Sequence, residues 1–477
     1  MGATGAPQRA GSHGVMKMTV IGCGYLGATH AACMAELGHD VLGVDVDATK
    51  IESLGAGTVP FFEPNLDDVL KRNIAAGRLR FTTDFAEAAQ FGRVHFLGVG
   101  TPQQPTSGAA DLTALRTAVR ALVGQLRGEH LIVGKSTVPV GTSAELADEI
   151  AALARHASVE LAWNPEFLRE GFAVDDTLRP DRIVVGTDPG RPDSRAADKL
   201  AEVYRAILDE PTPYLTMDWA TAELVKVSAN AFLATKISFI NAISEICEVA
   251  GGDVTALADA IGHDARIGRR FLNAGLGFGG GCLPKDIRAF AARAEELGVG
   301  SALSFLRQVD EVNMRRRTAA VAMVERACDG SVLGRNVAVL GAAFKPESDD
   351  VRDSPALAVA AQLALRGARV AVFDPKAMGN AARGFPTLRY AESAPAAARN
   401  ADVVIVATEW AEFVHMSPDE LSGIVARRLI VDARRCLDGD SWTAAGWDYR
   451  ALGSTVDGPA PAAVEVVAAA QNSESLV

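Results

Sequence analysis

The chain has 477 residues, which is too long for a single hydrophobic core. Domains of roughly 100–200 residues predict about three units. Its 48% hydrophobic and 22% charged residues are typical of a globular protein, and a net charge of −12 argues against a non-specific nucleic-acid binder. Six cysteines without a C-x-x-C pair predict reduced thiols and a cytoplasmic location. The eight histidines are dispersed and predict no metal site.

Two further segments bear on targeting. Residues 1–15 lack the apolar segment of a secretion signal, and we expect a loose tail there and in the Ala-, Pro- and Ser-rich residues 456–477. The longest apolar segment, 224–246, carries Lys226, Lys236 and Glu245, which argues against a membrane span.

Short apolar runs separated by helix-length segments follow one another through the first two hundred residues. Such runs are typical of a mostly parallel sheet with helices on both faces, and they predict a first domain over residues 16–212. The expected strands cover residues 16–21, 40–45, 94–99, 131–133, 159–162 and 183–185.

The rest of the chain predicts a helical centre and a second sheet. Residues 218–249 contain neither Gly nor Pro and predict one helix of about 50 Å that ends at Gly251 and bridges two domains, within a central region 213–330. The later runs predict a second doubly wound domain, 331–455. The expected strands there cover residues 336–340, 368–373, 403–407 and 429–431. The fold class is therefore α/β, with two doubly wound Rossmann-like domains joined by a long central helix.

The first expected strand runs into Gly22-x-Gly24-x-x-Gly27, with Tyr25 and Leu26 inside the motif and a helix behind it. Glycines here allow a tight turn and close backbone approach to a pyrophosphate, while the helix N-terminus favours its negative charge. Asp45 ends the next strand, 18 residues after Gly27. A carboxylate at this position accepts hydrogen bonds from ribose hydroxyls and repels a 2′-phosphate. This context predicts an NAD site. The alternative is a glycine-rich turn without a ligand.

Two threonines follow later strands. Thr101 comes after the strand 94–99, and Thr137 after the strand 131–133, where strand ends line a cofactor site. Taken by themselves, these two residues favour the alternative of ordinary strand-to-helix turn chemistry.

Residues 275–281 contain five glycines and lead into Cys282, with Asp286 four residues later. A helix that begins near Pro284 would place Cys282 at its N-terminus, where we expect a lowered thiol pKa and a nucleophile. The alternative is a buried cysteine acting as a small hydrophobe.

Two pairs of polar residues are spaced to share a helix face. Lys226 and Asn230 lie four apart in apolar surroundings and should be buried with partners, unless they stand at the helix surface. Glu166 and Glu170 would share a face if the segment after the strand 159–162 were helical. Their alternative is a charged helix start.

Taken in order, these segments resemble the UDP-glucose/GDP-mannose dehydrogenase family, over about residues 16–452. The resemblance rests on GCGYLG, KSTVPVGT, NPEFLREG, ELVKVSANAFLATKISFINAISE, FLNAGLGFGGGCLPKD, AFKPESDDVRDSP, TEW and DAR. It implies an N-terminal NAD domain, a central region that forms a homodimer, and a C-terminal nucleotide-sugar domain. Gly281 stands where many members have Ser, so that hydroxyl is missing here.

The resemblance also implies roles for individual residues. Cys282 matches the nucleophile, Lys226 and Asp286 the groups at the oxyanion and a catalytic water, and Thr137 and Asn230 the groups that position that water and the sugar. Glu166 matches the residue that assists thioester hydrolysis, and Glu170 a neighbouring acid. Arg266 resembles an arginine that reaches the sugar of the partner subunit. The remaining expected contacts are Lys50 and Arg352 to the cofactor, and Phe167, Leu168, Phe271, Asn273, Gly279, Lys345 and Arg434 to the substrate.

The chemistry that the resemblance implies is an NAD-dependent, four-electron oxidation of a nucleotide-sugar at C6, through a thiohemiacetal and a thioester on Cys282. UDP-glucose is the expected substrate, because the stretch NPEFLREGFAVDDTLRPDRIVVG looks like the group that uses it, and GDP-mannose is the alternative. A single-step hydroxy-acid dehydrogenase would have no use for Cys282. A nucleotide-sensing or scaffold protein would be expected to lose Cys282, Lys226 or Asp286.

Overall fold

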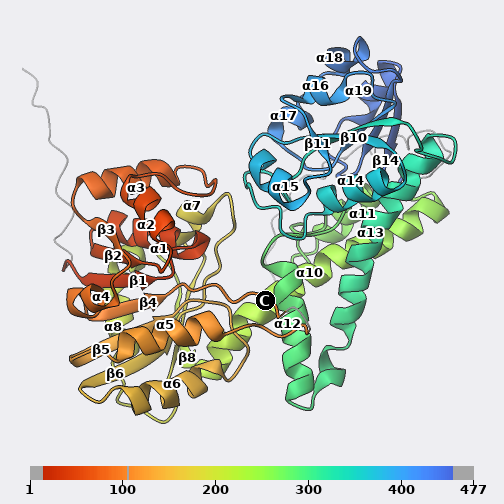
Figure 1. Cartoon of the computed structure of the whole chain (residues 1–477). Coiled ribbons are helices and arrows are strands. Elements are labelled where there is room, and N and C mark those ends of the chain that lie inside the picture. Colours follow the sequence, from red (N-terminus) through yellow and green to blue (C-terminus); the bar gives the residue numbers. More distant parts are fainter. Residues whose placement is uncertain (1–13, 105–106, 455–477) are drawn as a thin grey trace, which may run out of the picture.

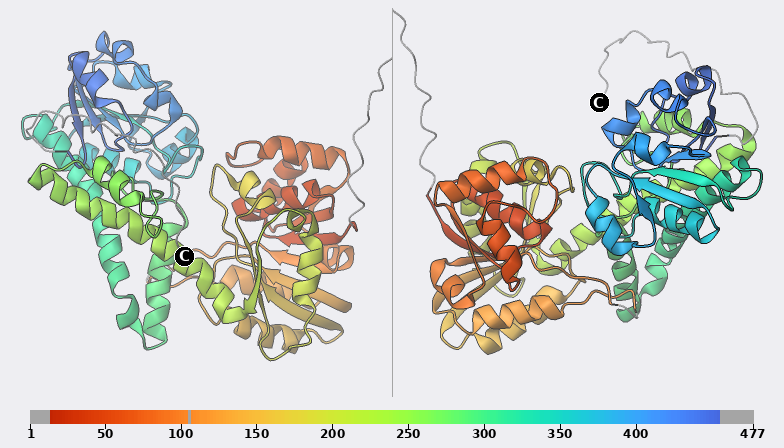
Figure 2. Two further views of the ribbon diagram at one scale, coloured as in Figure 1. Left: turned by 180° about the vertical axis from the view of Figure 1, so that it is seen from behind. Right: turned by 45° about the horizontal axis from the view of Figure 1, so that its top comes forward.

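The computed structural model describes residues 14–104 and 107–454. Figure 1 shows two α/β lobes joined by a long helix, and the turned views of Figure 2 show the two lobes standing apart at its two ends. The expected tails, 1–15 and 456–477, lie outside the described residues apart from Gly14 and Val15.

The first lobe contains an eight-stranded sheet in the order β3-β2-β1-β4-β5-β6-β7-β8. Neighbouring strands are parallel except β6 and β7, which confirms the mostly parallel sheet. Its strands are β1 (Lys17–Ile21), β2 (Asp40–Val44), β3 (Leu79–Thr82), β4 (Val94–Leu97), β5 (Gly128–Gly134), β6 (Ala157–Trp163), β7 (Ile183–Thr187) and β8 (Tyr214–Asp218). The strand order reverses between β1 and β4, the place where ligands bind in such sheets.

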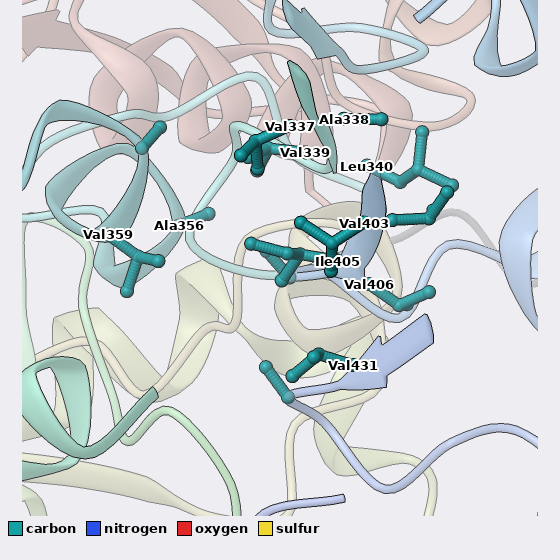
Figure 3. Packing of buried hydrophobic residues seen from close by; sticks show 14 of the residues in the cluster. Val337, Ala338, Val339, Leu340, Ala356, Val359, Val403, Ile405, Val406 and Val431 are labelled. Carbon is teal, nitrogen blue, oxygen red and sulfur yellow. The ribbon is translucent and has the colours of Figure 1, made fainter. Parts of the chain in front are cut away.

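The second lobe repeats the same winding on a smaller scale, as a six-stranded parallel sheet in the order β11-β10-β9-β12-β13-β14. Its strands are β9 (Asn336–Leu340), β10 (Arg369–Phe373), β11 (Arg389–Tyr390), β12 (Val403–Val406), β13 (Leu429–Asp432) and β14 (Asp448–Ala451). Val339, Ile405 and Val431 lie at its centre (Figure 3), where β-branched side chains pack well on both faces of a covered sheet.

Helices cover both sheets and form the centre of the molecule. Those of the first lobe are α1 (Tyr25–Glu36), α2 (Ala48–Gly55), α3 (Leu66–Ala75), α4 (Phe85–Phe91), α5 (Thr113–Val123), α6 (Thr142–Leu153), α7 (Ala173–Leu178), α8 (Ala196–Val203) and α9 (Arg205–Leu208). The central ones are α10 (Trp219–Ala250), α11 (Val254–Gly262), α12 (Leu283–Glu296) and α13 (Phe305–Ala327). Those of the second lobe are α14 (Pro355–Leu365), α15 (Met378–Gly384), α16 (Ala394–Ala398), α17 (Ala411–Val414), α18 (Pro418–Ser422) and α19 (Gly439–Ala444).

The expected bridging helix is confirmed as α10, which has 32 residues and runs from one lobe to the other in Figure 1. It begins at an N-cap, Asp218, whose carboxylate accepts a hydrogen bond from the Thr221 amide at 2.8 Å. It ends at Gly251 in the left-handed conformation, with φ of 82°, which glycine adopts without a steric penalty.

Four strands were not predicted from the sequence: β3, β8, β11 and β14. They are the outer strands of the two sheets, and β8 consists of half-buried and exposed residues and is not a buried apolar run. A search for apolar runs finds strands covered on both faces and misses edges that face water. Within the described ranges, none of the helices has the length and apolar character needed to cross a membrane.

Candidate active site

The expected cofactor loop lies between β1 and α1, at the point where the first sheet reverses. Gly22 has φ of 89°, and a Cβ at Gly27 would lie 1.7 Å from the Gly22 carbonyl oxygen, so neither position has room for a side chain. Gly24 is the N-cap of α1 and faces open space. The first turn of α1 is therefore free to receive a pyrophosphate, which fits a dinucleotide.

Asp45 is buried at the end of β2, beside this loop. Its carboxylate accepts hydrogen bonds from the Cys23 amide at 2.8 Å and from the Asp47 amide at 3.0 Å. Lys50 donates to the same carboxylate at 2.9 Å. The acid is thus fixed at the position where a ribose of the dinucleotide would be bound.

Thr101 and Thr137 are brought together although they follow different strands. The Thr101 hydroxyl donates to the Thr137 carbonyl at 2.7 Å and ties the ends of β4 and β5 to each other. The Thr137 side chain lines a small cavity together with Lys285 and Asp286 of α12. Thr137 therefore stands between the cofactor lobe and the helix that follows Cys282.

Lys226 of α10 is buried, and its ammonium group forms an ion pair with Glu166 at 3.0 Å. Burial disfavours the charge on Lys226, but Glu166, Cys282 and Asp286 together hold its pKa above the usual range. The prediction of a buried, partnered lysine is confirmed, and the side chain is a cation next to the thiol.

Asn230 and Asp286 are also buried and contact each other. The Asn230 amide donates to Asp286 at 2.7 Å, and Lys285 donates to the other carboxylate oxygen at 2.6 Å. Asp286 lies in the first turn of α12, while Asn230 lies one turn after Lys226 on α10. The packing of these two helices therefore places the lysine, the amide and the acid around Cys282.

Cys282 is the N-cap of α12, with Pro284 in the first turn, as expected. The expected fall in its pKa is wrong. The residue is exposed to solvent, yet the protein packed around its thiol raises the pKa to about 12. Glu166, Asp286 and Glu170 contribute to this rise, and Lys226 opposes it. Burial of the thiol is the largest cause of the raised pKa, and the three carboxylates together act more strongly on the sulfur than the one lysine does.

The segment 164–171 corrects another expectation, since it is a loop and not a helix. Its amides donate to carboxylates instead of helical carbonyls: Leu168 to Glu166 at 2.7 Å, Arg169 to Asp176 at 2.8 Å, and Gly171 to Glu63 at 2.6 Å. The acids therefore diverge from an extended chain. Glu166 reaches Lys226, while Glu170 turns to the second lobe.

Two of the basic residues expected at the cofactor or the substrate, Lys345 and Arg352, contact Glu170. Lys345 donates to the Glu170 carbonyl, Ser348 to its carboxylate at 2.8 Å, and Arg352 approaches it to 3.5 Å. Burial, with Asp350 nearby, raises the pKa of Glu170 to about 7. Phe167, from the same loop, lies beneath the guanidinium of Arg182 at 3.9 Å.

The glycine-rich loop before Cys282 passes close to its surroundings at several points. A Cβ at Gly279 would lie 2.5 Å from the Asp353 carbonyl, and one at Gly281 only 2.2 Å from the Arg352 guanidinium carbon. Glycine at position 281 therefore leaves space for Arg352. Arg434 donates to the Gly277 carbonyl at 2.9 Å and to the Phe344 carbonyl at 3.1 Å, which joins the loop to the second lobe.

Three of the expected substrate residues are not brought to Cys282. Arg266 is 88% exposed and pairs with Asp264 at 2.6 Å, and Asn273 accepts a hydrogen bond from Arg269 at 2.7 Å. Phe271 is exposed, with a left-handed φ of 67°. These residues follow α11, and Arg266 and Asn273 pair with their near neighbours Asp264 and Arg269.

The second lobe has a loop and acid arranged like those of the first. Gly341 follows β9 with φ of 113°, and Asp374 at the end of β10 accepts from the amides of Ala342 and Ala343 at 2.8 and 2.9 Å. This arrangement matches that of Asp45 beside the first loop, and it offers a second nucleotide-binding surface.

Two residues that hold the site, Glu63 and Asn313, were not predicted from the sequence. Glu63 holds the end of the loop 164–171, and Asn313 donates to and accepts from Phe278 at 3.0 and 2.8 Å, which holds the glycine-rich loop. For Glu63 the sequence does offer a signal, because a carboxylate between two aromatic residues and a proline, in residues 60–64, indicates a buried acid. For Asn313 the sequence offers no such signal. Across the described residues there is no group of three or more His, Cys, Asp or Glu that could hold a metal ion.

A dinucleotide-type lobe, a second nucleotide-type lobe and a thiol beside a lysine define a dehydrogenase for a nucleotide-linked substrate. The chain belongs to the UDP-glucose/GDP-mannose dehydrogenase family. The family's NAD binding domain matches residues 16–208, its central domain 220–315 and its UDP binding domain 338–439.

Known relatives cover nearly the whole chain. It is 42% identical over 438 residues to a UDP-glucose 6-dehydrogenase of Rhizobium meliloti, which spans 92% of this chain and 99% of the relative. It is 38% identical to the UDP-glucose 6-dehydrogenase YwqF of Bacillus subtilis, with coverage of 92% and 98%. The solved UDP-glucose dehydrogenase of Pyrobaculum islandicum has a TM-score of 0.85 and 38% identity, over 94% of this chain and 99% of that one.

Proposed function

We propose that this protein oxidises C6 of UDP-glucose to the carboxylate of UDP-glucuronate, in two NAD-dependent steps that share one thiol. The single observation that carries the proposal is the meeting of Cys282, Lys226 and Asp286 between a cofactor lobe and a UDP-type lobe. The relatives reported above are named for UDP-glucose, which makes it the first substrate to test.

The glycine loop at Gly22–Gly27 and Asp45 would hold NAD, which when bound supplies the hydride acceptor for both oxidations. Thr101, Thr137 and Lys50 lie beside that position. In the second lobe, Lys345, Arg352 and Arg434 are the basic groups available to a diphosphate. We assign residues 16–212 to the cofactor, 213–330 to the central region and 331–455 to the nucleotide-sugar.

Cys282 acts after the first oxidation has produced an aldehyde. Its sulfur bonds to the aldehyde carbon and gives a thiohemiacetal, while its proton passes to a nearby carboxylate, for which Glu166 and Asp286 are the candidates. Lys226 stabilises the oxyanion at the same carbon. Covalent capture is needed because a tetrahedral thiohemiacetal can lose a hydride, and the second oxidation then leaves a thioester.

Water then releases the product from the thioester. Asp286, held by Asn230, is placed to bind that water, and Glu166 is placed to accept its proton. Attack by the water oxygen breaks the carbon–sulfur bond, and the thiol of Cys282 is restored as the uronic acid leaves.

We also propose a homodimer formed through α10. Phe232, Phe239 and Ile246 follow one another at seven-residue spacing and are 66%, 51% and 61% exposed. Such a spacing keeps them on one face of the helix, and an apolar stripe of this kind is typical of an interface. A second copy would also give Arg266 a site to reach, which its own chain does not offer.

A cytoplasmic location is consistent with the cysteines, because all six are free thiols in the structure.

The test is an assay of NADH formed from UDP-glucose, GDP-mannose and UDP-N-acetylhexosamines, with the ratio of NADH to sugar measured. We expect two NADH per UDP-glucose, and no sustained turnover to the acid in Cys282→Ser. One NADH per substrate would instead support a single-step dehydrogenase, and preference for GDP-mannose would change the substrate assignment alone.

A further inference from the structure

Three consecutive residues between α2 and α3 contact three different parts of the molecule. The Phe61 ring packs on the Tyr25 ring of the cofactor helix, with 4.8 Å between their centroids. Phe62 points the other way, packs against the core of the second lobe and lies 4.5 Å beneath the Lys376 ammonium group. Glu63, between these aromatic residues and Pro64, turns into the protein and is 6% exposed.

The Glu63 carboxylate has a complete set of donors around it. One oxygen accepts from the Ala173 amide at 2.7 Å. The other accepts from the Gly171 amide at 2.6 Å and from the Tyr25 hydroxyl. The carboxylate thus joins the first turn of the cofactor helix α1, the end of the loop 164–171 and the start of α7. None of these elements is its neighbour in sequence.

The loop 164–171 depends on such external acceptors because it has no helix or strand of its own. Gly171 packs closely against the second lobe, since a Cβ at this position would lie 2.6 Å from the Glu347 carbonyl oxygen. Glu170, the residue before it, contacts Ser348 and Lys345. Glu63 therefore fixes the end of the loop from one side, while residues of the second lobe contact it from the other.

We infer that Glu63 is a positioning residue of the reaction: it sets where Glu166 and Glu170 stand relative to Cys282 by holding the loop that carries them. This inference rests on the proposed function. Because Glu166 is placed to serve thioester hydrolysis, loss of the Glu63 carboxylate should slow product release from Cys282 more than the two oxidations that precede it.

The test is Glu63→Gln, with Glu52→Gln as the matched control, because Glu52 is an exposed carboxylate on α2 in the same lobe. A glutamine can accept with one oxygen only, so one of the Gly171 and Ala173 amides would face an amide donor. NADH formation is followed by rapid mixing with UDP-glucose and excess NAD, and melting temperatures are recorded for both variants.

We expect Glu63→Gln to show a burst of about two NADH per site, followed by a steady rate at least about tenfold below that of the control. The KM for UDP-glucose should change by less than about threefold. Equal steady rates in the two variants, or a slower rate without a burst, would overturn the inference. Wild-type protein with one NADH per sugar would refute the proposed function instead, so the two failures can be distinguished.

A second variant guards against misfolding of the first. Tyr25→Phe removes one donor to Glu63 and keeps the ring that packs on Phe61. It should show the same burst with a smaller loss of steady rate, about threefold, since the two backbone amides still hold the carboxylate. Wild-type kinetics in this variant, together with an unfolded Glu63→Gln, would assign Glu63 to stability alone and overturn the inference.

Discussion

Lys226 and Glu166 form an ion pair of 3.0 Å beside Cys282, and the two charges shift the thiol pKa in opposite directions. Lysine lowers the pKa and stabilises the anionic states of the sulfur and of the bound carbon. Glutamate raises the pKa, although the same carboxylate is placed to accept a proton later. Glu166 therefore makes the thiol less reactive, while its carboxylate is available for hydrolysis of the thioester.

Glu166→Gln should separate these two effects. Removing the negative charge lowers the pKa of Cys282, so alkylation of the thiol by iodoacetamide at pH 8 should become faster. Turnover of UDP-glucose should nevertheless fall by about 10²-fold or more, since a general base is lost.

Glu160→Gln is the control for that experiment, because Glu160 also pairs with a lysine, Lys199 at 3.1 Å, on β6 outside the site. It should change neither quantity. If Glu166→Gln slowed both alkylation and turnover, the electrostatic role assigned to Glu166 would be wrong.

The pH dependence of Cys282 alkylation gives a direct check on its pKa of about 12. Only the thiolate reacts, so the rate should keep rising about tenfold per pH unit from pH 7 to pH 10, without a plateau. Lys226→Met should lower the rate throughout, because the cation that favours the thiolate is gone.

Cys282→Ala serves to subtract the reaction of the other five cysteines, which are buried or half-buried. A plateau below pH 9 would show that the cofactor-free thiol is activated as the sequence had suggested.

The first lobe carries a buried histidine that should make it sensitive to acid. Burial, with His130 and Arg93 nearby, lowers the pKa of His95 to about 3, and the ring is held by Thr19 at 2.7 Å and His130 at 2.9 Å. The histidine pKa is near 6.5 in the unfolded chain, so on acidification the unfolded chain binds the proton at a higher pH than the folded protein does. The contribution of His95 to the free energy of unfolding is therefore fully present above pH 6.5 and is lost as the pH falls toward 3.

At pH 5 this loss should amount to about 2 kcal/mol from His95. Urea unfolding at pH 7.5 and pH 5 measures it. His95→Gln should reduce the difference between the two pH values, while His156→Gln, at an exposed position on the same lobe, should leave it unchanged. An unaltered difference in His95→Gln would place the acid sensitivity elsewhere.

The proposed dimer face on α10 can be tested by Phe239→Glu. A charge in an apolar interface costs several kcal/mol, so light scattering should shift from a dimer to a single chain of 50.0 kDa. Leu365→Glu, on the exposed side of α14, should leave the assembly intact. A dimer that survives Phe239→Glu would move the interface away from α10.

The sequence alone determined those features that depend on neighbours in the chain. The glycine loop after β1, the 32-residue α10 and the placing of Cys282 at the start of α12 follow from spacing, caps and the absence of helix breakers. The buried strands followed from their apolar runs, whereas the water-facing edges β3 and β8 did not.

Tertiary structure decided what depends on residues far apart. The thiol pKa of Cys282 depends on burial and on charges that include Glu166 and Glu170 of the first lobe, which no local pattern reveals. The amides of the loop 164–171 donate to carboxylates, and one of these, Glu63, lies 108 positions before its partner Gly171. Periodicity reports which face of an element is buried, but only the folded chain brings distant charges within reach of one sulfur atom.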